Sequence, residues 1–217
     1  ADIAGLEGGA AKAGLAGPML NQLTQMDVLI HVARGFEDEA VPHPTGRVDA
    51  ARDIEAMDAE LLLNDLIAVE RKLERLTEER KKGGTDKVLN ERQTALFTRL
   101  HETLSSEKPL REMEITAEEE KLLSGFGLLT RKPLLVLINL GEGQQAPEVR
   151  SKHPTMALQG KLEMEIAQLP EEDAATFMQE YGITELSLQR MIKASYDLLD
   201  QQSFFTVGED EVRAWTT

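Results

Sequence analysis

The chain has 217 residues and a mass of 24.1 kDa, and its 39 acidic against 24 basic residues give a formal charge of -15. This length allows one or two domains and a sizeable buried core. The acidic balance excludes a surface that grips nucleic acid everywhere, because that binding needs Lys and Arg against phosphates. We therefore expect no sequence-specific DNA partner.

Cysteine is absent, which excludes a disulfide framework and a thiolate metal site. The four histidines lie too far apart in the sequence for a zinc-binding pair. The apolar run Leu134–Ile138 is far shorter than the roughly 18 residues of a membrane span. No charged segment followed by an apolar one opens the chain as a signal peptide would. These features predict a soluble, cytoplasmic protein without a membrane partner.

The first 20 residues are rich in glycine, which predicts a mobile loop rather than the start of a helix. The next segment, Met26 to Ala33, is short, apolar and partly β-branched, and predicts a buried strand. An acidic loop, Phe36 to Glu39, follows this strand.

Residues 49–82 predict a long helix, with apolar side chains spaced four, three, four and three residues apart at Leu62, Leu66, Val69, Leu73 and Leu76. Gly83-Gly84 ends it, and a second leucine-bearing helix, from about Leu89 to Leu104, precedes Pro109. We expect the two helices to form an antiparallel hairpin.

The tip of this hairpin is basic, because Arg71 to Lys87 contains seven positive and four negative residues, a local charge of +3. A solvated helix face with ordinary ion pairs, such as Glu78 with Lys82, explains this charge better than a dedicated RNA contact.

Further along, Thr116-Ala117-Glu118-Glu119 has the pattern of a capping box and predicts a helix start. The continuous apolar run Leu134–Ile138 is typical of a parallel strand covered on both faces. Helices are predicted from Pro170, where proline and acids suit a first turn, and from Leu186 to Leu199. The tail from Phe204 to Gly208 predicts a new strand.

Two short motifs could carry chemistry. Asp2-Ile3-Ala4-Gly5 is a DxxG tetrapeptide, in which nucleotide-hydrolysing proteins use the Asp for Mg²⁺ and the Gly amide for the terminal phosphate. Asn139 to Glu142 directly follows the strand Leu134–Ile138, at the end where parallel sheets bind ligands. Each motif is weak alone: a simple turn explains Asp2–Gly5 better than a nucleotide site does, and Asn139–Glu142 also reads as a polar turn that closes a strand. Their order and strand context are what make the pair informative.

Four blocks of the chain resemble the YchF, or Obg-like, ATPases from end to end. The tail resembles the start of that family's TGS domain, the head its Walker B segment and glycine-rich switch, and the middle the start of its inserted hairpin. The matching residues are Phe204–Gly208 with Glu211–Thr216, Asp2–Leu6, Phe36–Asp38, and Asp53–Glu55 with Glu60–Leu61.

The resemblance implies an α/β fold, a partial P-loop NTPase (G domain) with an inserted antiparallel helical coiled-coil hairpin, helix-rich overall. The implied domains are a partial G domain at 1–48, the insertion at 49–108, the rest of the G domain at 109–203 and the start of a TGS domain at 204–217. It also implies a ribosome-associated enzyme that hydrolyses ATP, with GTP left open as a second substrate. The hairpin and TGS faces would contact the ribosome.

By position in this resemblance, Asp2 would bind Mg²⁺ and Gly5 would contact the γ-phosphate. Leu6 stands where many relatives of the wider class carry a water-positioning glutamine, so another group, a bound potassium ion or a partner must help. Asn139, Leu140 and Glu142 match an Asn-x-x-Glu base-reading motif. A guanine-reading motif ends instead in Asp, so the resemblance implies a preference for adenine.

The chain departs from the family in two ways. The Ser-Ala or Ser-Gly element near the base aligns with Gln159-Gly160. No GxxxxGK[ST] phosphate loop occurs in the sequence. We therefore expect an internal fragment, deficient in nucleotide binding by itself, of a protein with an upstream phosphate loop and a complete TGS domain. The alternative is a non-enzymatic helical module that docks on a ribosome or protein through the basic tip.

Overall fold

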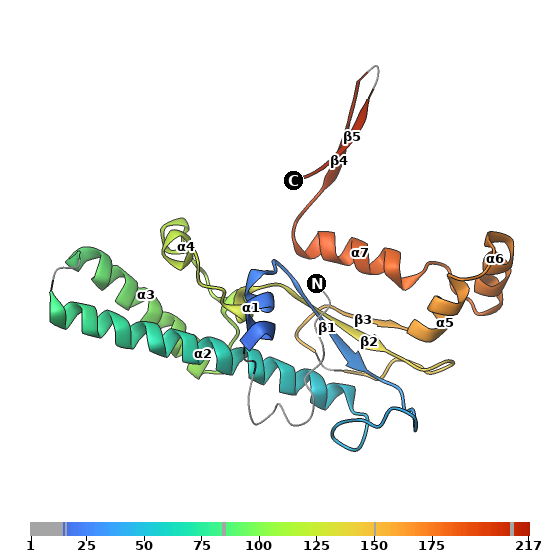
Figure 1. Cartoon of the computed structure of the whole chain (residues 1–217), viewed down its shortest axis with the longest axis horizontal. Coiled ribbons are helices and arrows are strands. Elements are labelled where there is room, and N and C mark those ends of the chain that lie inside the picture. The colour runs from blue at the N-terminus through green and yellow to red at the C-terminus, as the bar shows by residue number, and fades with distance from the viewer. Residues whose placement is uncertain (1–14, 16, 84–85, 150, 209–210) are drawn as a thin grey trace. The chain divides into compact units, whose positions relative to one another are not determined.

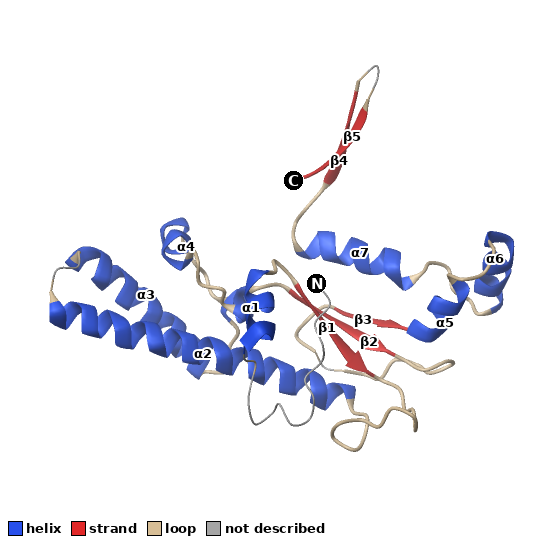
Figure 2. Ribbon diagram, viewed as in Figure 1, coloured by secondary structure: helices blue, strands red, loops and turns tan. Residues whose placement is uncertain are grey.

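The computed structural model describes Leu15 and residues 17–83, 86–149, 151–208 and 211–217. These residues form two compact units (Figures 1 and 2). One contains the described residues up to Met26 together with Glu55–Lys132, and the other contains Asp27–Ile54 together with Pro133–Thr217. The fold is mixed α/β with a parallel sheet, as the sequence predicts.

The parallel sheet lies in the second unit and has the order β1-β2-β3. Its strands are β1 (Leu29–Arg34), β2 (Leu134–Asn139) and β3 (Thr155–Leu158). In β2 every residue from Leu134 to Ile138 is buried, because this strand is paired on both edges and covered on both faces. The prediction of a buried parallel strand is confirmed here. β1 begins at Leu29 rather than at Met26.

Helices and a ribbon follow the sheet in the same unit. They are α5 (Gly160–Ile166), α6 (Glu171–Glu180), α7 (Ser187–Leu198) and an antiparallel pair, β4 (Ser203–Val207) and β5 (Val212–Thr216). Pro170 precedes α6 and three acids occupy its first turn, as predicted. The helix predicted at 186–199 is α7, which lies against β2 and β3. The strand predicted at the tail is β4.

The first unit is built on two long helices, α2 (Ala50–Lys82, of which residues from Glu55 belong to this unit) and α3 (Lys87–Ser105). The two helices are antiparallel, because residues later in α3 meet residues earlier in α2. Asn90 Nδ2 donates to the Leu76 carbonyl over 3.1 Å, and His101 Nε2 lies 3.4 Å from Glu70 Oε1. Helix α2 ends at Lys82, and Gly83 adopts a left-handed φ of 68° that ends helices readily. Whether the pair is a coiled coil inserted into another fold stays a prediction.

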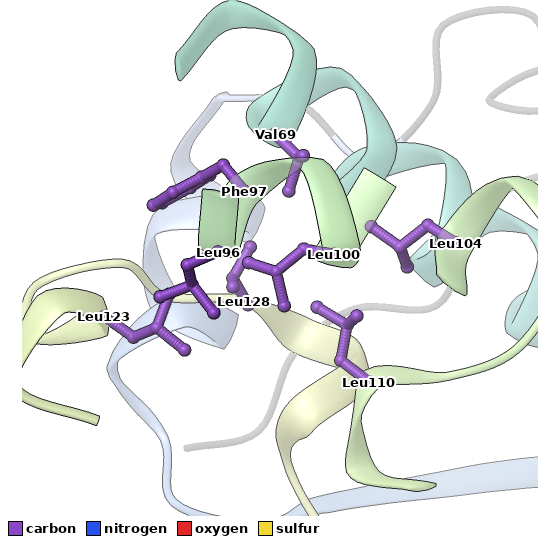
Figure 3. Close-up of a cluster of buried hydrophobic side chains, with 8 residues drawn as sticks. All are labelled: Val69, Leu96, Phe97, Leu100, Leu104, Leu110, Leu123 and Leu128. Carbon is purple, nitrogen blue, oxygen red and sulfur yellow. The ribbon is translucent and has the colours of Figure 1, made fainter. Parts of the chain in front are cut away.

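A hydrophobic cluster joins these helices to the segment that follows them (Figure 3). It consists of side chains from α2, α3, the 3₁₀ turn η2 (Leu110–Glu112), helix α4 (Ala117–Leu123) and the residues after it. The buried members are Val69, Leu96, Phe97, Leu100, Leu104, Leu110, Leu123 and Leu128. Phe97 is fully buried and meets Phe126 edge-on, with ring centroids 4.9 Å apart. This cluster is the core of the first unit.

The capping box predicted at the start of α4 is confirmed. The Thr116 hydroxyl accepts from the Glu119 amide, and the Glu119 carboxylate accepts from the Thr116 amide over 2.9 Å. The hydrogen bond from the Thr116 amide is the largest influence that lowers the pKa of Glu119. Reciprocal satisfaction of these two end groups fixes where the helix begins.

The glycine-rich opening differs from the prediction in its last part. Residues 17–20 belong to helix α1 (Gly17–Gln25), whereas a loop was predicted there. Lys132 Nζ donates to the carbonyls of Thr24, over 3.0 Å, and Met26 at the end of this helix, where a positive charge is favourable. Gly127 packs so tightly on α1 that a Cβ there would lie 2.4 Å from Cβ of Thr24. These contacts with distant residues carry no local sequence signal.

Within the part of the chain that the structure describes, no helix is long and apolar enough to span a bilayer.

Asp65, on α2, has a buried carboxylate in the interior of the first unit. It is 2% exposed and accepts hydrogen bonds from the amides of Leu129 and Thr130, at 2.8 and 2.7 Å, and from the Thr130 hydroxyl at 2.6 Å. These bonds fix the 3₁₀ turn η3 (Leu129–Arg131) against α2.

Burial raises the pKa of Asp65 above its ordinary value of 3.8, and the hydrogen bonds and the charge of Arg111 offset this only in part. The folded state therefore holds the Asp65 proton more tightly than the unfolded state. The resulting stabilisation is complete below about pH 3.8 and is lost as the pH rises through the folded-state pKa.

We predict that Asp65→Asn lowers the free energy of unfolding by about 1–3 kcal/mol, because its amide nitrogen would face a buried N–H donor. Since Asn does not titrate, the difference between wild type and variant should shrink as the pH rises above 3.8. Urea unfolding at a series of pH values measures both effects. The exposed Asp197→Asn is the control and should change stability by less than about 0.5 kcal/mol. A difference that grows with pH would contradict the assigned direction.

Candidate functional site at the carboxyl edge of the sheet

The carboxyl ends of the three parallel strands lie in register. Arg34 at the end of β1 pairs with Asn139 at the end of β2, which in turn pairs with Leu158 at the end of β3. The segments after the strands, residues 35–46, 140–144 and 159–160, therefore start from one edge of the sheet (Figure 2). This is the edge at which open α/β sheets bind their ligands.

Asn139 and Gly160 are in direct contact at this edge. The Gly160 amide donates to Asn139 Oδ1 over 3.0 Å, so the side-chain NH₂ of Asn139 remains available as a donor. A Cβ at position 160 would lie 2.9 Å from the same oxygen, which is closer than real contacts allow. A larger residue at 160 would therefore require the Asn139 side chain to shift away from the start of α5.

Leu140 points into the protein and is 7% exposed, and its amide donates to the Leu158 carbonyl over 2.8 Å. It therefore extends the pairing of β2 with β3 by one residue. A buried apolar side chain at this position contributes packing and offers no charge to a ligand at the edge.

Glu142 lies on the exposed turn Gly141–Gln144. The turn is closed by two hydrogen bonds, from the Gln144 amide to the Gly141 carbonyl (3.2 Å) and from the Gly141 amide to Gln144 Oε1 (2.9 Å). Gly143 has a φ of 69°, which suits glycine in a turn. Its amide donates to Gln159 Oε1 over 3.2 Å, so the turn is attached to the start of α5.

Arg34 organises the loop that follows β1. Its guanidinium donates to the carbonyls of Phe36, over 2.8 Å, and Val41, over 2.6 Å, and lies 4.6 Å from the centre of the Phe36 ring. The Gly35 amide donates to the Asn139 carbonyl over 2.7 Å, which joins this loop to the end of β2.

The same loop lines an open, shallow hollow of about 420 Å³. Three acidic residues and one histidine are among its lining residues, which are Glu37, Asp38, Glu39, Pro42, His43 and Gly46. His43 Nε2 lies 3.1 Å from Asp53 Oδ2, and the other oxygen of Asp53 accepts from Arg52. Grouped carboxylates repel phosphate, so this lining does not provide a phosphate cradle.

Glu163 anchors the helix that begins with Gly160. Its carboxylate accepts from the Ser187 amide, over 2.6 Å, and from the Ser187 hydroxyl, although the two residues are 24 positions apart. This ties α5 to the start of α7. Neither this contact nor the role of Gln144 could be found from the sequence, because Glu163, Ser187 and Gln144 belong to no recognisable motif.

The predicted site residues fall into two groups. Asp2, Gly5 and Leu6 lie outside the described residues. The other five are described: Asn139, Leu140, Gln159 and Gly160 come together at one edge of the sheet, and Glu142 occupies the adjoining turn. Among the described residues no three His, Asp or Glu side chains are grouped as a metal site would require. The roles of all eight residues stay predictions.

Curated proteins similar to this chain are described as YchF or Obg-like ATPases. The chain is 37% identical over 99% of its length to the ribosome-binding ATPase YchF of Bacillus subtilis, of which it covers 62%. It is 34% identical over 99% of its length to the ribosome-binding ATPase YchF of Escherichia coli O157:H7 and 31% identical over 99% to the Obg-like ATPase 1 of Caenorhabditis elegans, covering 61% and 58% of them. No family model matches the chain.

A solved structure agrees with these relatives. The Schizosaccharomyces pombe YchF GTPase superposes with a TM-score of 0.79 at 26% identity, over 94% of this chain and 58% of that one. The chain thus spans about three fifths of the length of the relatives it matches. The resemblance seen in the four sequence blocks is confirmed.

Proposed function

We infer, from the homology of this chain to the YchF and Obg-like ATPases over 99% of its length, that it forms part of a ribosome-associated P-loop ATPase acting in the cytoplasm. The observation that carries the proposal is the contact between Asn139 and Gly160 at the carboxyl edge of the parallel sheet. It supports a site there for the base of a nucleotide, and the reaction would convert ATP to ADP and phosphate.

In this proposal Asn139 offers its side-chain NH₂ to the base, while Leu140 supports the strand from inside. The Glu142 carboxylate stands where a guanine-reading protein carries Asp, which accepts two hydrogen bonds from the guanine edge. The longer Glu on an exposed turn fits that edge poorly, which supports a preference for ATP over GTP. Gln159 and Gly160 complete the base end of the site.

The phosphate end of the proposed site rests on the sequence alone. Asp2 would hold Mg²⁺, which supplies charge neutralisation at the phosphates, and Gly5 would offer its amide to the terminal phosphate. Leu6 cannot orient a water molecule, so a potassium ion or a partner would have to assist.

The proposed domain division follows the resemblance. Residues 1–48 and 109–203 would be parts of a G domain, 49–108 its inserted coiled-coil hairpin and 204–217 the first part of a TGS domain. The antiparallel contacts between α2 and α3, together with the Phe97 cluster, support a hairpin that is stable as a unit. The exposed aromatic side chains Phe204, Phe205 and Trp215 support a ribbon that packs against further chain.

A second candidate is a non-enzymatic helical module that docks on a ribosome or protein. It is favoured by the exposed basic residues Arg80, Lys81 and Lys82 at the end of α2. An upstream GxxxxGK[ST] loop in the complete reading frame would decide for the ATPase, and its absence would decide for the module. Lys82 also lies 3.9 Å from Glu78 in the predicted ion pair, so an ordinary solvated face accounts for part of this charge.

We predict that the protein expressed from its complete reading frame hydrolyses ATP with a kcat/KM at least about tenfold higher than for GTP, a difference of about 1.4 kcal/mol. Glu142→Asp should narrow this ratio, because Asp suits the guanine edge. Steady-state kinetics with both nucleotides measure it, and the exposed Glu148→Asp is the matched control. A clear preference of the wild type for GTP would refute the role given to Glu142.

We predict that the 217 residues alone bind ATP weakly or not at all, because a phosphate loop normally supplies most of the phosphate contacts. Isothermal titration calorimetry with ATP, in the presence and absence of Mg²⁺, is the measurement. Tight, Mg²⁺-dependent binding would show that this part of the protein is sufficient for the site.

The basic tip is tested by reversing the charges of Arg80, Lys81 and Lys82 to Glu in the complete protein. If the tip contacts the ribosome, co-sedimentation should fall and its salt dependence should weaken, because fewer phosphates are neutralised. The control reverses three other exposed lysines, Lys108, Lys121 and Lys193, and has the same net charge. Equal binding by both variants and the wild type would exclude the tip as the main contact.

A further inference from the structure

The side chain of Gln159 makes a connection that the resemblance does not assign. Its Oε1 accepts from the Gly143 amide over 3.2 Å, between residues 16 positions apart in the chain. The two other hydrogen bonds of the Gly141–Gln144 turn lie within the turn itself. Gln159 therefore attaches the turn to the start of α5.

The far side of this connection is held by two further hydrogen bonds. Helix α5 begins at Gly160, whose amide is bonded to Asn139, and Glu163 one turn later is bonded to Ser187 at the start of α7. The Gln159 side chain is half-buried, whereas Glu142 and Gly143 are exposed. A fixed acceptor thus holds an exposed turn at its glycine, next to the carboxylate-bearing residue.

We propose that Gln159 is a positioning residue for base specificity: by holding Gly143 it fixes the turn that carries Glu142 beside Asn139, where the purine base of a nucleoside triphosphate is read. The proposal rests on the proposed function and names a residue that acts through the turn rather than by touching the base.

Gly160 has a related positioning role in the same arrangement. With glycine there, Asn139 approaches the start of α5 to within hydrogen-bonding distance, and an alanine Cβ, at 2.9 Å from Oδ1, would force the Asn139 side chain to shift. Gln159 and Gly160 therefore act as a pair: the first sets the distance of the turn from the helix, and the second sets the position of the Asn139 amide. Together they define the two sides between which the base edge would fit.

The test compares three variants of the protein expressed from its complete reading frame. Gln159→Met keeps the length of the side chain and removes the acceptor, and Gln159→Glu keeps an acceptor. Gln168→Met, exposed just after α5, is the matched control. The measurements are kcat and KM for ATP and for GTP, the affinity for inorganic tripolyphosphate, and the melting temperature.

Losing one hydrogen bond of ordinary strength should reduce the ratio of ATP to GTP specificity by roughly fivefold in Gln159→Met, with a larger change in KM than in kcat. Gln168→Met should retain the wild-type ratio, and Gln159→Glu should lose less of it than Gln159→Met, because its carboxylate still accepts from the Gly143 amide. Binding of tripolyphosphate should be unaffected in all three, because it has no base.

Two results would overturn the inference while leaving the proposed function intact. In the first, the wild type discriminates between ATP and GTP and Gln159→Met discriminates equally well. In the second, Gln159→Met has a lower affinity for tripolyphosphate and a lower melting temperature as well as a lower specificity ratio. Such a combination indicates a general structural defect. A wild type that hydrolyses neither nucleotide, or treats both alike, would overturn the proposed function and this inference together.

Discussion

The structure of the second unit depends on the burial of β2 between two parallel neighbours. Five consecutive apolar residues leave no polar face, so the strand is stable only with β1 on one edge, β3 on the other and cover on both faces. Parallel pairing of β1 with β2 also requires a crossover connection. Residues 35–133, which include the long helices α2 and α3, form that connection. One buried strand therefore determines where the polar segments after all three strands begin.

Polar side chains far apart in the sequence stabilise both units in the same way. Asp65 satisfies two amides and a hydroxyl at positions 129 and 130, Asn139 satisfies the amide of Gly160, and Glu163 satisfies the amide of Ser187. In each case a side-chain oxygen accepts from backbone N–H groups at the start of a helix or turn, which would otherwise be unsatisfied. The apolar cores bring the segments together, and these bonds fix their ends.

Most of the regular elements could be predicted from the sequence because their signals are local. Leucine spacing gave α2 and α3, the Thr116–Glu119 pattern gave the start of α4, and the unbroken apolar run gave β2. β3 has only four residues and a partly exposed pattern, and α5 begins with glycine, so neither has a periodic signal. β5 is exposed throughout, as β4 is, but it lacks the adjacent aromatic pair Phe204-Phe205 that marked β4, so it was missed.

The residues of the candidate site also divide into those with a local sequence signal and those without one. Asn139, Leu140 and Glu142 could be found because they follow the apolar strand directly. The bonds that give them their geometry could not be predicted, because Gly143 meets Gln159 across a loop, and Gly160 meets Asn139 through a pairing of β2 with β3 that the sequence did not reveal. Local patterns therefore locate the residues that would touch a ligand, whereas tertiary structure selects the residues that position them.

The charge at the sheet edge constrains how a nucleotide could lie there. The loop after β1 has three acidic residues around its hollow, and Glu142 adds a fourth carboxylate on the neighbouring turn. A triphosphate directed at either loop would meet like charge without a compensating metal ion. The uncharged amides of Asn139 and Gln159 and the small Gly160 instead favour a neutral, planar group. The edge as described is therefore suited to the base, and the phosphates of a bound nucleotide must extend toward groups other than these two acidic loops.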